Sequence, residues 1–181
     1  TQNELHNMKH MSILAVSLLA LVACTPEKKQ EADYSQYVNP MIGTDFTGNT
    51  YPGAQVPFGM VQLSPDNGLP GWDRISGYFY PDTTIAGFSH THLSGTGAGD
   101  LYDISFMPVT RPYKEAPAPL GIYSTFSHND EAASAGYYRV LLKDYNINVE
   151  LTATERCGIQ RYTFPEAEAL SLIHISEPTR L

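Results

Sequence analysis

Glycine and proline interrupt this sequence so often that long helices have no room outside one apolar run near the N-terminus. The 181 residues include 14 glycines and 13 prolines, and both residue types break helix interiors. The apolar segments between them are short and end in turn-forming residues, as strands do. The sequence therefore predicts an all-β fold rich in turns.

Two neighbouring segments show the period-two alternation of strands that bury one face. Ile147, Val149 and Leu151 alternate with polar residues, and 137–144 repeats the pattern. The intervening 143–146 predicts a hairpin turn, and 154–157 predicts the next turn. Seven or eight short strands favour a β-sandwich. The other candidate strands are 60–63, 77–80, 85–93, 103–109, 121–128 and 158–164.

The N-terminal apolar run is typical of a targeting segment. Residues 11–23 are uncharged and too short to span a bilayer, which needs about 20 residues, so they predict a signal-peptide core. The run ends in Leu-Val-Ala-Cys24, which resembles a bacterial lipobox, with Cys24 as the lipidated residue. The alternative is an ordinary secretory signal in which Cys24 is incidental. A lipid anchor would tether the mature chain to a membrane, giving an outer-membrane or cell-surface lipoprotein, or a periplasmic protein.

The C-terminal residues differ in character from the rest of the chain. Residues 170–180 resemble translated sequencing-adapter read-through, and the alternative is a short strand over 171–176 that Pro178 ends. We divide the chain into 1–23 (upstream residues and signal peptide), 24–36 (polar tether), 37–170 (sandwich domain) and 171–181 (adapter-derived artefact). Each discarded end contains one acidic and one basic residue, so the net charge of −8 belongs to the domain. That charge argues against a nucleic-acid partner.

Three glycine-rich clusters could provide chemistry: 39–44, 71–80 and 87–100. Glycine leaves core volume unfilled and buried polar side chains need partners, so we expect these clusters in loops at one end of the sandwich. Trp72 beside Asp73 has the form of a sugar subsite, in which a ring covers the apolar face of a pyranose and a carboxylate accepts hydroxyl protons. The alternative, equally weighted from composition, is that Trp72 plugs the sandwich edge.

The histidines of the third cluster allow two interpretations. His90 and His92 would share one face of a strand and could bind a metal with Asp100 or Asp103, but we favour hydrogen bonding in a cleft or at an interface. The Ser94-Gly-Thr-Gly segment lacks the lysine and helix of a phosphate-binding loop. Without a Gly-x-Ser-x-Gly elbow we assign no nucleophile, and Cys157 is predicted to be a small buried residue. We assign no catalytic residue and no metal ligand.

Five ordered motifs resemble one known family. They are Asn-Pro-Met-Ile-Gly-Thr (39–44), Tyr-Pro-Gly-Ala (51–54), Pro-Phe-Gly-Met-Val-Gln-Leu-Ser-Pro-Asp (57–66), Ser-Gly-Tyr (76–78) and the histidine cluster (87–100). Together they are similar to the amino-terminal domain of glycoside hydrolase family 92, the calcium-dependent exo-acting α-mannosidases abundant in gut Bacteroidota. The resemblance covers roughly residues 37–165.

The resemblance implies a supersandwich-like β-sandwich that an α/α-toroid domain follows in the complete enzyme. Family members hydrolyse with inversion, using a glutamic acid, an aspartate base and calcium. These groups are expected in the toroid domain, which is missing from this chain, so the fragment alone should be inactive.

The family's residues transfer to this chain only in part. The tryptophan of the Gly-Trp-Asp segment, here Trp72, is implied as the leaving-sugar contact, and Asp73 less directly. Relatives often have cysteine and histidine where this chain has Ile75 and Phe79, so its linkage preference is open. Residues implied to shape the loop and the domain interface are His90, His92, Ser94 and Asp100.

The sequence thus predicts the substrate-pocket domain of a lipid-anchored exo-α-mannosidase that acts on mannose-rich N-glycans or mannan. Its expected partners are mannose-containing glycans, its own toroid domain and a membrane. The alternative is a free-standing carbohydrate-binding surface lipoprotein of the same fold.

Overall fold

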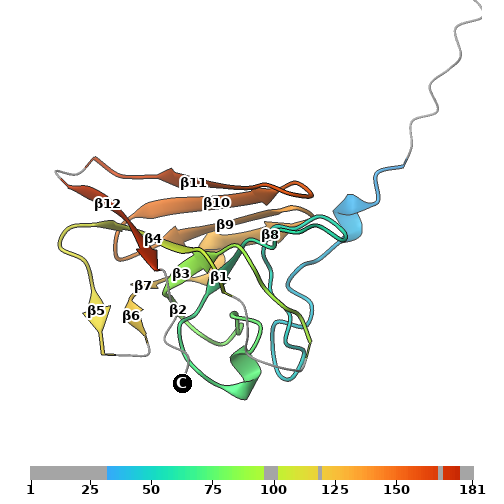
Figure 1. Ribbon diagram of the computed structural model, residues 1–181, viewed down its shortest axis with the longest axis horizontal. Coiled ribbons are helices and arrows are strands. Elements are labelled where there is room, and N and C mark those ends of the chain that lie inside the picture. The colour runs from blue at the N-terminus through green and yellow to red at the C-terminus, as the bar shows by residue number, and fades with distance from the viewer. Residues whose placement is uncertain (1–31, 96–101, 118–119, 167–168, 176–181) are drawn as a thin grey trace, which may run out of the picture. The chain divides into compact units, whose positions relative to one another are not determined.

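A computed structural model describes residues 32–95, 102–117, 120–166 and 169–175 (Figure 1). The chain divides into two compact units, Thr1–Asp33 and Tyr34–Leu181. The proposed signal run and Cys24 lie outside the described residues, and the fold described here is that of the second unit. Within the described ranges, no helix is long and apolar enough to cross a membrane.

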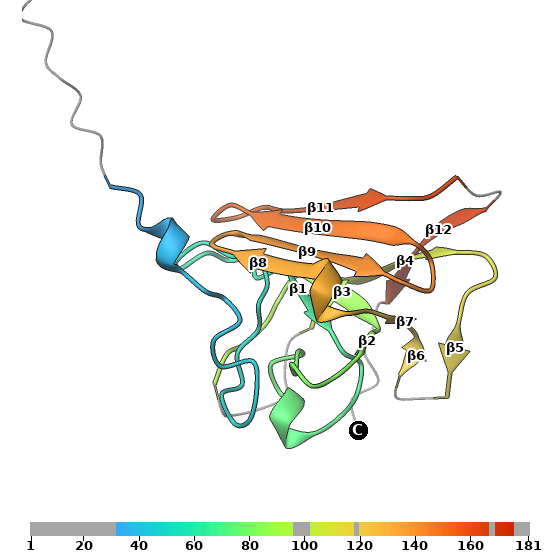
Figure 2. The ribbon, with the colours of Figure 1, turned by 180° about the vertical axis from the view of Figure 1, so that it is seen from behind.

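Two four-stranded antiparallel sheets form the body of the second unit, as in a sandwich (Figures 1 and 2). One sheet has the order β1-β3-β4-β12. Its strands are β1 (Ser64–Asp66), β3 (Gly87–Ser89), β4 (Ser105–Thr110) and β12 (Leu170–Ile175). The other sheet has the order β11-β10-β9-β8. Its strands are β8 (Glu131–Ser134), β9 (Tyr137–Leu142), β10 (Ile147–Ala153) and β11 (Gly158–Thr163).

Smaller elements complete the described part of the fold. Two short antiparallel pairs join β2 (Thr84–Ile85) to β7 (Ser124–Thr125) and β5 (Glu115–Ala116) to β6 (Gly121–Ile122). The helical residues in the described ranges form 3-10 turns, η1 (Ser35–Tyr37), η2 (Trp72–Arg74) and η3 (His128–Asp130). The predicted all-β class is confirmed.

The alternating segments form the central hairpin of the second sheet. Val149 pairs with Val140 and Leu151 with Tyr138 in antiparallel register, and all four side chains are buried. Since successive side chains point to opposite faces of a strand, the apolar set of both strands faces the core. Residues 143–146 form the turn, with Asn146 at a positive φ of 51°. The predicted hairpin is confirmed.

One apolar core lies between the sheets. The first sheet and its loops contribute Leu63, Tyr78, Phe88, Met107 and Val109, each with no exposed surface. These residues cluster with the apolar face of β9 and β10. The core therefore holds β3, β4 and the segment before β1 against the second sheet.

The prediction of a strand at 77–80 is wrong, because the backbone of this segment bonds to loops. Gly77 O accepts from Asn67 N (2.8 Å), and Phe79 N donates to the Asn67 side chain (2.6 Å). Tyr80 N donates to Thr44 O at 2.8 Å. Tyr78 is nevertheless fully buried in the core, although no ladder forms.

Other strand predictions differ from the structure in extent. Residues 60–63 form a single bridge, Leu63 to Ala54, and 85–93 and 121–128 are each broken into shorter pieces. Strand β8 was not predicted, since Glu-Ala-Ala-Ser shows no apolar alternation. Residues 170–175 form β12, which pairs with β4 from Leu170↔Thr110 to Ile175↔Ser105. The assignment of 171–181 as adapter-derived stays a prediction.

Replacing Leu151 with alanine tests the core. Leu151 is 1% exposed and faces Tyr138 across the hairpin. The lost contacts and the resulting cavity should lower the free energy of unfolding by about 2–5 kcal/mol in urea titrations followed by circular dichroism. Thr163→Ser, on the exposed face of β11, is the control and should change it by less than about 0.5 kcal/mol. A loss below about 1 kcal/mol for Leu151→Ala would mean that this face is not core.

Candidate functional site

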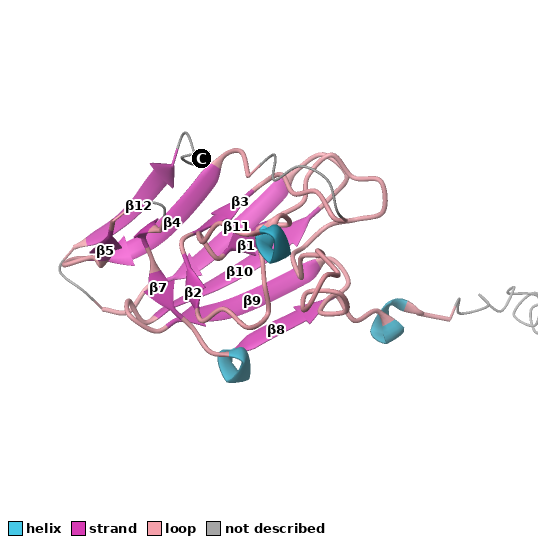
Figure 3. Cartoon of the chain, turned by 90° about the horizontal axis from the view of Figure 1, so that it is seen from below, coloured by secondary structure: helices cyan, strands magenta, loops and turns pink. Residues whose placement is uncertain are grey.

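The three glycine-rich clusters meet in the structure. One hydrogen bond joins the second cluster to the first, and two more join the second and third clusters to residues 49–50, which follow the first cluster. These bonds run from Tyr80 N to Thr44 O (2.8 Å), from Ser76 Oγ to Thr50 O (3.0 Å) and from Gly95 N to Asn49 O (2.7 Å). In Figure 3 many loops lie at one end of the strands, but the central helical turn, η2, lies in front of the middle of the strands. The clusters therefore contact one another as predicted, whereas the prediction that they lie in loops at one end of the sandwich is wrong for η2 and for Gly87–Ser89, which form β3.

Trp72 opens the 3-10 turn η2 and projects from this loop surface. Its side chain is 60% exposed, whereas Asp73 beside it is half-buried. The exposed ring does not plug the sandwich edge, so that alternative is wrong. A flat, accessible aromatic face next to a carboxylate can pack on the C–H face of a sugar ring and accept its hydroxyl protons.

A bidentate ion pair holds η2 in place. Arg74 Nε and Nη2 donate to the two carboxylate oxygens of Asp82 at 2.6 and 2.5 Å, and Asp82 is 8% exposed. The guanidinium also lies over the Phe79 ring, 4.8 Å from its centre. The hydrogen bond to Asp82 raises the pKa of Arg74. The pair therefore clamps the turn that presents Trp72 to the segment around Asp82.

His92 lies in the interior beneath these loops. Its side chain has no exposed surface, and Nε2 contacts Asp66 Oδ1 at 2.8 Å while Nδ1 contacts Gln62 O at 2.8 Å. Its ring packs against the Tyr51 ring at 5.0 Å, and burial raises the pKa of that tyrosine to about 12. His92 thus joins β1 to the histidine cluster.

Gly77 closes over the His92–Asp66 pair in a conformation that only glycine tolerates. Its φ is +88°, and a Cβ there would lie 2.6 Å from Asp66 Oδ1 and 2.9 Å from the Tyr102 ring. A side chain at this position would combine backbone strain with a clash. The close approach explains the glycine of the Ser-Gly-Tyr motif.

The two histidines of the third cluster do not share a face. β3 ends at Ser89, so the prediction that His90 and His92 lie on one strand face is wrong. His90 is partly exposed and its Nδ1 contacts Ile104 O at 2.8 Å. Ser94 is exposed, and Asp100 lies outside the described residues.

The described residues show no group of three or more His, Cys, Asp or Glu side chains arranged to hold a metal ion. The described residues thus offer no carboxylate cluster to the calcium that the resemblance implies, and its assignment to the following domain stays a prediction. Cys157, predicted to be buried, is exposed in the turn between β10 and β11.

A second polar cluster, not predicted from the sequence, surrounds Glu131 at the start of β8. Its side chain is 1% exposed and accepts hydrogen bonds from the hydroxyls of Tyr78 (3.0 Å) and Tyr138 (2.5 Å) and from His128 Nδ1 (2.6 Å). Burial and the charge of Glu131 raise the pKa of Tyr78 and Tyr138, so both remain donors. The partners lie up to 53 residues apart, and no local motif in the sequence indicated their contact.

The fold and the loop surface define an antiparallel all-β domain with an exposed aromatic residue on a clamped polar loop. The family model described as glycosyl hydrolase family 92 N-terminal domain matches residues 37–179. The chain belongs to glycosyl hydrolase family 92 and comprises that N-terminal domain.

Solved structures agree with this assignment. The α-mannosidase BT3965 from Bacteroides thetaiotaomicron, in complex with mannoimidazole, is 46% identical with a TM-score of 0.71, over 76% of this chain and 19% of its own. The inverting mannosidase BT2199 from the same organism is 32% identical with a TM-score of 0.63, over 80% of this chain and 20% of its own. An uncharacterized secreted glycosidase of Arthroderma benhamiae is 26% identical over 91% of this chain and 21% of its own. The chain thus spans about a fifth of the length of these relatives.

Breaking the Arg74–Asp82 pair should loosen Trp72. Trp72 is the only tryptophan of the chain, so its fluorescence anisotropy decay reports the motion of η2 directly. In Arg74→Met we expect a faster local decay, and a loss of about 1–3 kcal/mol in unfolding free energy because the Asp82 carboxylate stays buried without its partner. Arg161→Met removes an exposed arginine that binds Glu150 and serves as control. An unchanged decay in folded Arg74→Met would contradict the clamp.

Proposed function

We propose that this chain is the substrate-pocket domain of an exo-acting α-mannosidase that cleaves mannose-rich N-glycans or mannan with inversion of configuration. The main support is its 46% identity to an α-mannosidase whose structure contains mannoimidazole. The loop surface adds physical support, because Trp72 exposes its ring next to the Asp73 carboxylate. In this proposal the ring of Trp72 packs against the leaving sugar and Asp73 orients its hydroxyls.

The proposed hydrolysis needs groups from beyond this chain. Inversion requires a carboxylic acid that protonates the leaving oxygen and a carboxylate that activates water on the opposite face of the sugar. The chain spans about a fifth of its mannosidase relatives, so we assign both groups to a following α/α-toroid domain. Calcium, which would polarise the sugar hydroxyls, is assigned there as well. The residues of this chain bind and orient the substrate.

The loop surface also fits a protein partner. Several large apolar side chains on the loops are exposed, a pattern typical of interaction sites. These are Ile42 (73%), Phe46 (80%), Trp72 (60%) and Leu93 (47%). We propose that the toroid domain of the same protein covers part of this surface and leaves Trp72 accessible in the pocket between the domains.

The location of the protein is proposed from the sequence. The apolar run before Cys24 favours a lipoprotein held at the outer membrane or cell surface, or in the periplasm. Palmitate labelling of the chain in a bacterial host, with Cys24→Ser as control, tests this.

The enzyme proposal is tested by recovering the full reading frame. The complete protein should hydrolyse α-mannosides with inversion, and the 181-residue chain alone should release no mannose. In the complete protein, Trp72→Ala should raise KM about tenfold through the lost ring contact, while Trp72→Phe retains most of the affinity. A continuation that encodes no helical domain with a glutamic acid and an aspartate base would contradict the proposal. Sugar binding by the 181-residue chain that Trp72→Ala abolishes, without that continuation, would favour the carbohydrate-binding lipoprotein.

A further inference from the structure

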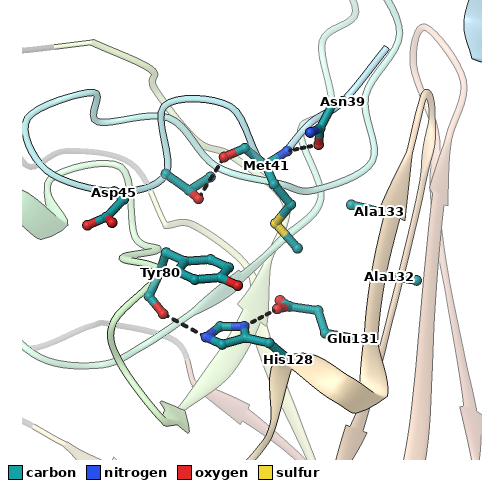
Figure 4. A pocket seen from close by; sticks show the side chains of 9 residues that line it. Asn39, Met41, Asp45, Tyr80, His128, Glu131, Ala132 and Ala133 are labelled. Atoms are coloured by element: carbon teal, nitrogen blue, oxygen red, sulfur yellow. Dashed lines mark hydrogen bonds and ion pairs between the residues drawn. The ribbon is translucent and has the colours of Figure 1, made fainter. Parts of the chain in front are cut away.

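An open pocket of about 470 Å³ lies beside the Glu131 cluster, and its lining includes neither Trp72 nor Asp73. The 39–45 loop, Tyr80, His128 of η3 and strand β8 surround it (Figure 4). Its volume is within the range of small-ligand sites. The function proposed above does not use these residues.

The floor of the pocket is a network of hydrogen bonds around the Glu131 carboxylate. Glu131 is almost fully buried and all the groups that face it donate hydrogen bonds, two from tyrosine hydroxyls and one from His128. The residues that form this floor come from three separate segments of the chain. A fully bonded polar network of this kind holds its members in one arrangement before a ligand arrives.

Tyr80 forms an aromatic wall that the same network positions. Its ring stacks on the His128 ring at 3.9 Å with 9° between the planes. His128 Nε2 also contacts Tyr80 O at 2.7 Å, so one histidine holds both the ring and the backbone of Tyr80. In Figure 4 the Tyr80 hydroxyl points toward the space between Met41 and Glu131. It forms no hydrogen bond with any residue in the described ranges.

Two more polar side chains lie at opposite ends of the pocket (Figure 4). Asn39 Oδ1 accepts from Met41 N at 3.0 Å, which leaves the amide NH₂ group to donate. Asp45 Oδ1 accepts from Phe46 N at 2.7 Å, which leaves its other oxygen to accept. Between them lie the apolar side chains of Met41 and Ala133.

This lining matches a neutral ring with hydroxyls on its edge and C–H groups on its faces. The amide donates, the carboxylate accepts, and the Tyr80 hydroxyl can do both. The carboxylate of Asp45 and the net charge of −8 disfavour an anionic ligand. We propose that this pocket binds one neutral pyranose ring, as a sugar site additional to the Trp72 surface. The choice of mannose as its ligand rests on the function proposed above.

Filling the pocket tests this proposal on the 181-residue chain. Ala133 on β8 lines the pocket with its Cβ toward the cavity (Figure 4), whereas Ala135, exposed in the turn after β8, is not among the lining residues. Methyl α-D-mannopyranoside would be titrated by saturation-transfer NMR. Ala133→Leu should weaken binding about tenfold or more, and the matched control Ala135→Leu should stay within about twofold. Both changes are made in the Trp72→Ala background, so that the Trp72 surface does not contribute to the measured binding. Thermal melting would show that both variants fold.

Two further variants separate this site from the Trp72 surface. Trp72→Ala removes the ring of the proposed leaving-sugar contact and should retain the binding that the pocket provides. In that background Tyr80→Ala should weaken the remaining binding, because the aromatic wall of the pocket is lost. Equal binding by Trp72→Ala with and without Ala133→Leu would overturn the proposal, as would loss of all binding in Trp72→Ala. No saturable binding by the wild-type chain would also overturn it. That last result would not contradict the enzyme proposal, which is tested separately by the KM of Trp72→Ala in the complete protein.

Discussion

The buried carboxylate of Glu131 is the contact on which the arrangement of sheets and loops depends. Through Tyr138 it binds β9, through Tyr78 the segment after η2, and through His128 the turn before β8. A charge removed from water is tolerated only when hydrogen bonds replace its hydration, and removing one partner of a buried pair costs about 3–5 kcal/mol. The loops on the β8 side therefore do not adopt their conformation independently. They are fixed to the second sheet by one residue that neither belongs to a motif nor lies on the surface.

The sequence predicted those parts of the fold in which local pattern and tertiary structure coincide. β9 and β10 alternate in sequence and also bury one face, so both the strands and their hairpin turn were correct. The 77–80 segment has strand-like composition, but the Asn67 side chain and the Thr44 carbonyl bind its backbone, and these partners are distant in sequence. β8 lies at a sheet edge and needs no apolar alternation. Cys157 was misassigned because burial was judged from residue type alone, whereas its position in a tight turn exposes it.

The candidate site, like the fold, could be predicted from the sequence only in part. Trp72 and Asp73 could be singled out from residue type, and the structure adds their exposure and the pair that clamps them, Arg74 with Asp82. The Glu131 cluster and its pocket could not be predicted from the sequence, because they form only when the 39–45 loop, the 77–80 segment and β8 come together. The proposed toroid domain would account for the exposed apolar side chains on the loops, which would be unusual for a protein that functions alone.

Gly77 has a consequence for how such domains can vary. Because any side chain there would press on the Asp66 carboxylate, a substitution would disturb the polar contacts beneath the loops while leaving the β9–β10 hairpin largely intact. The damaged protein would keep its strands and expose the apolar surface under its loops, a state prone to association with other copies.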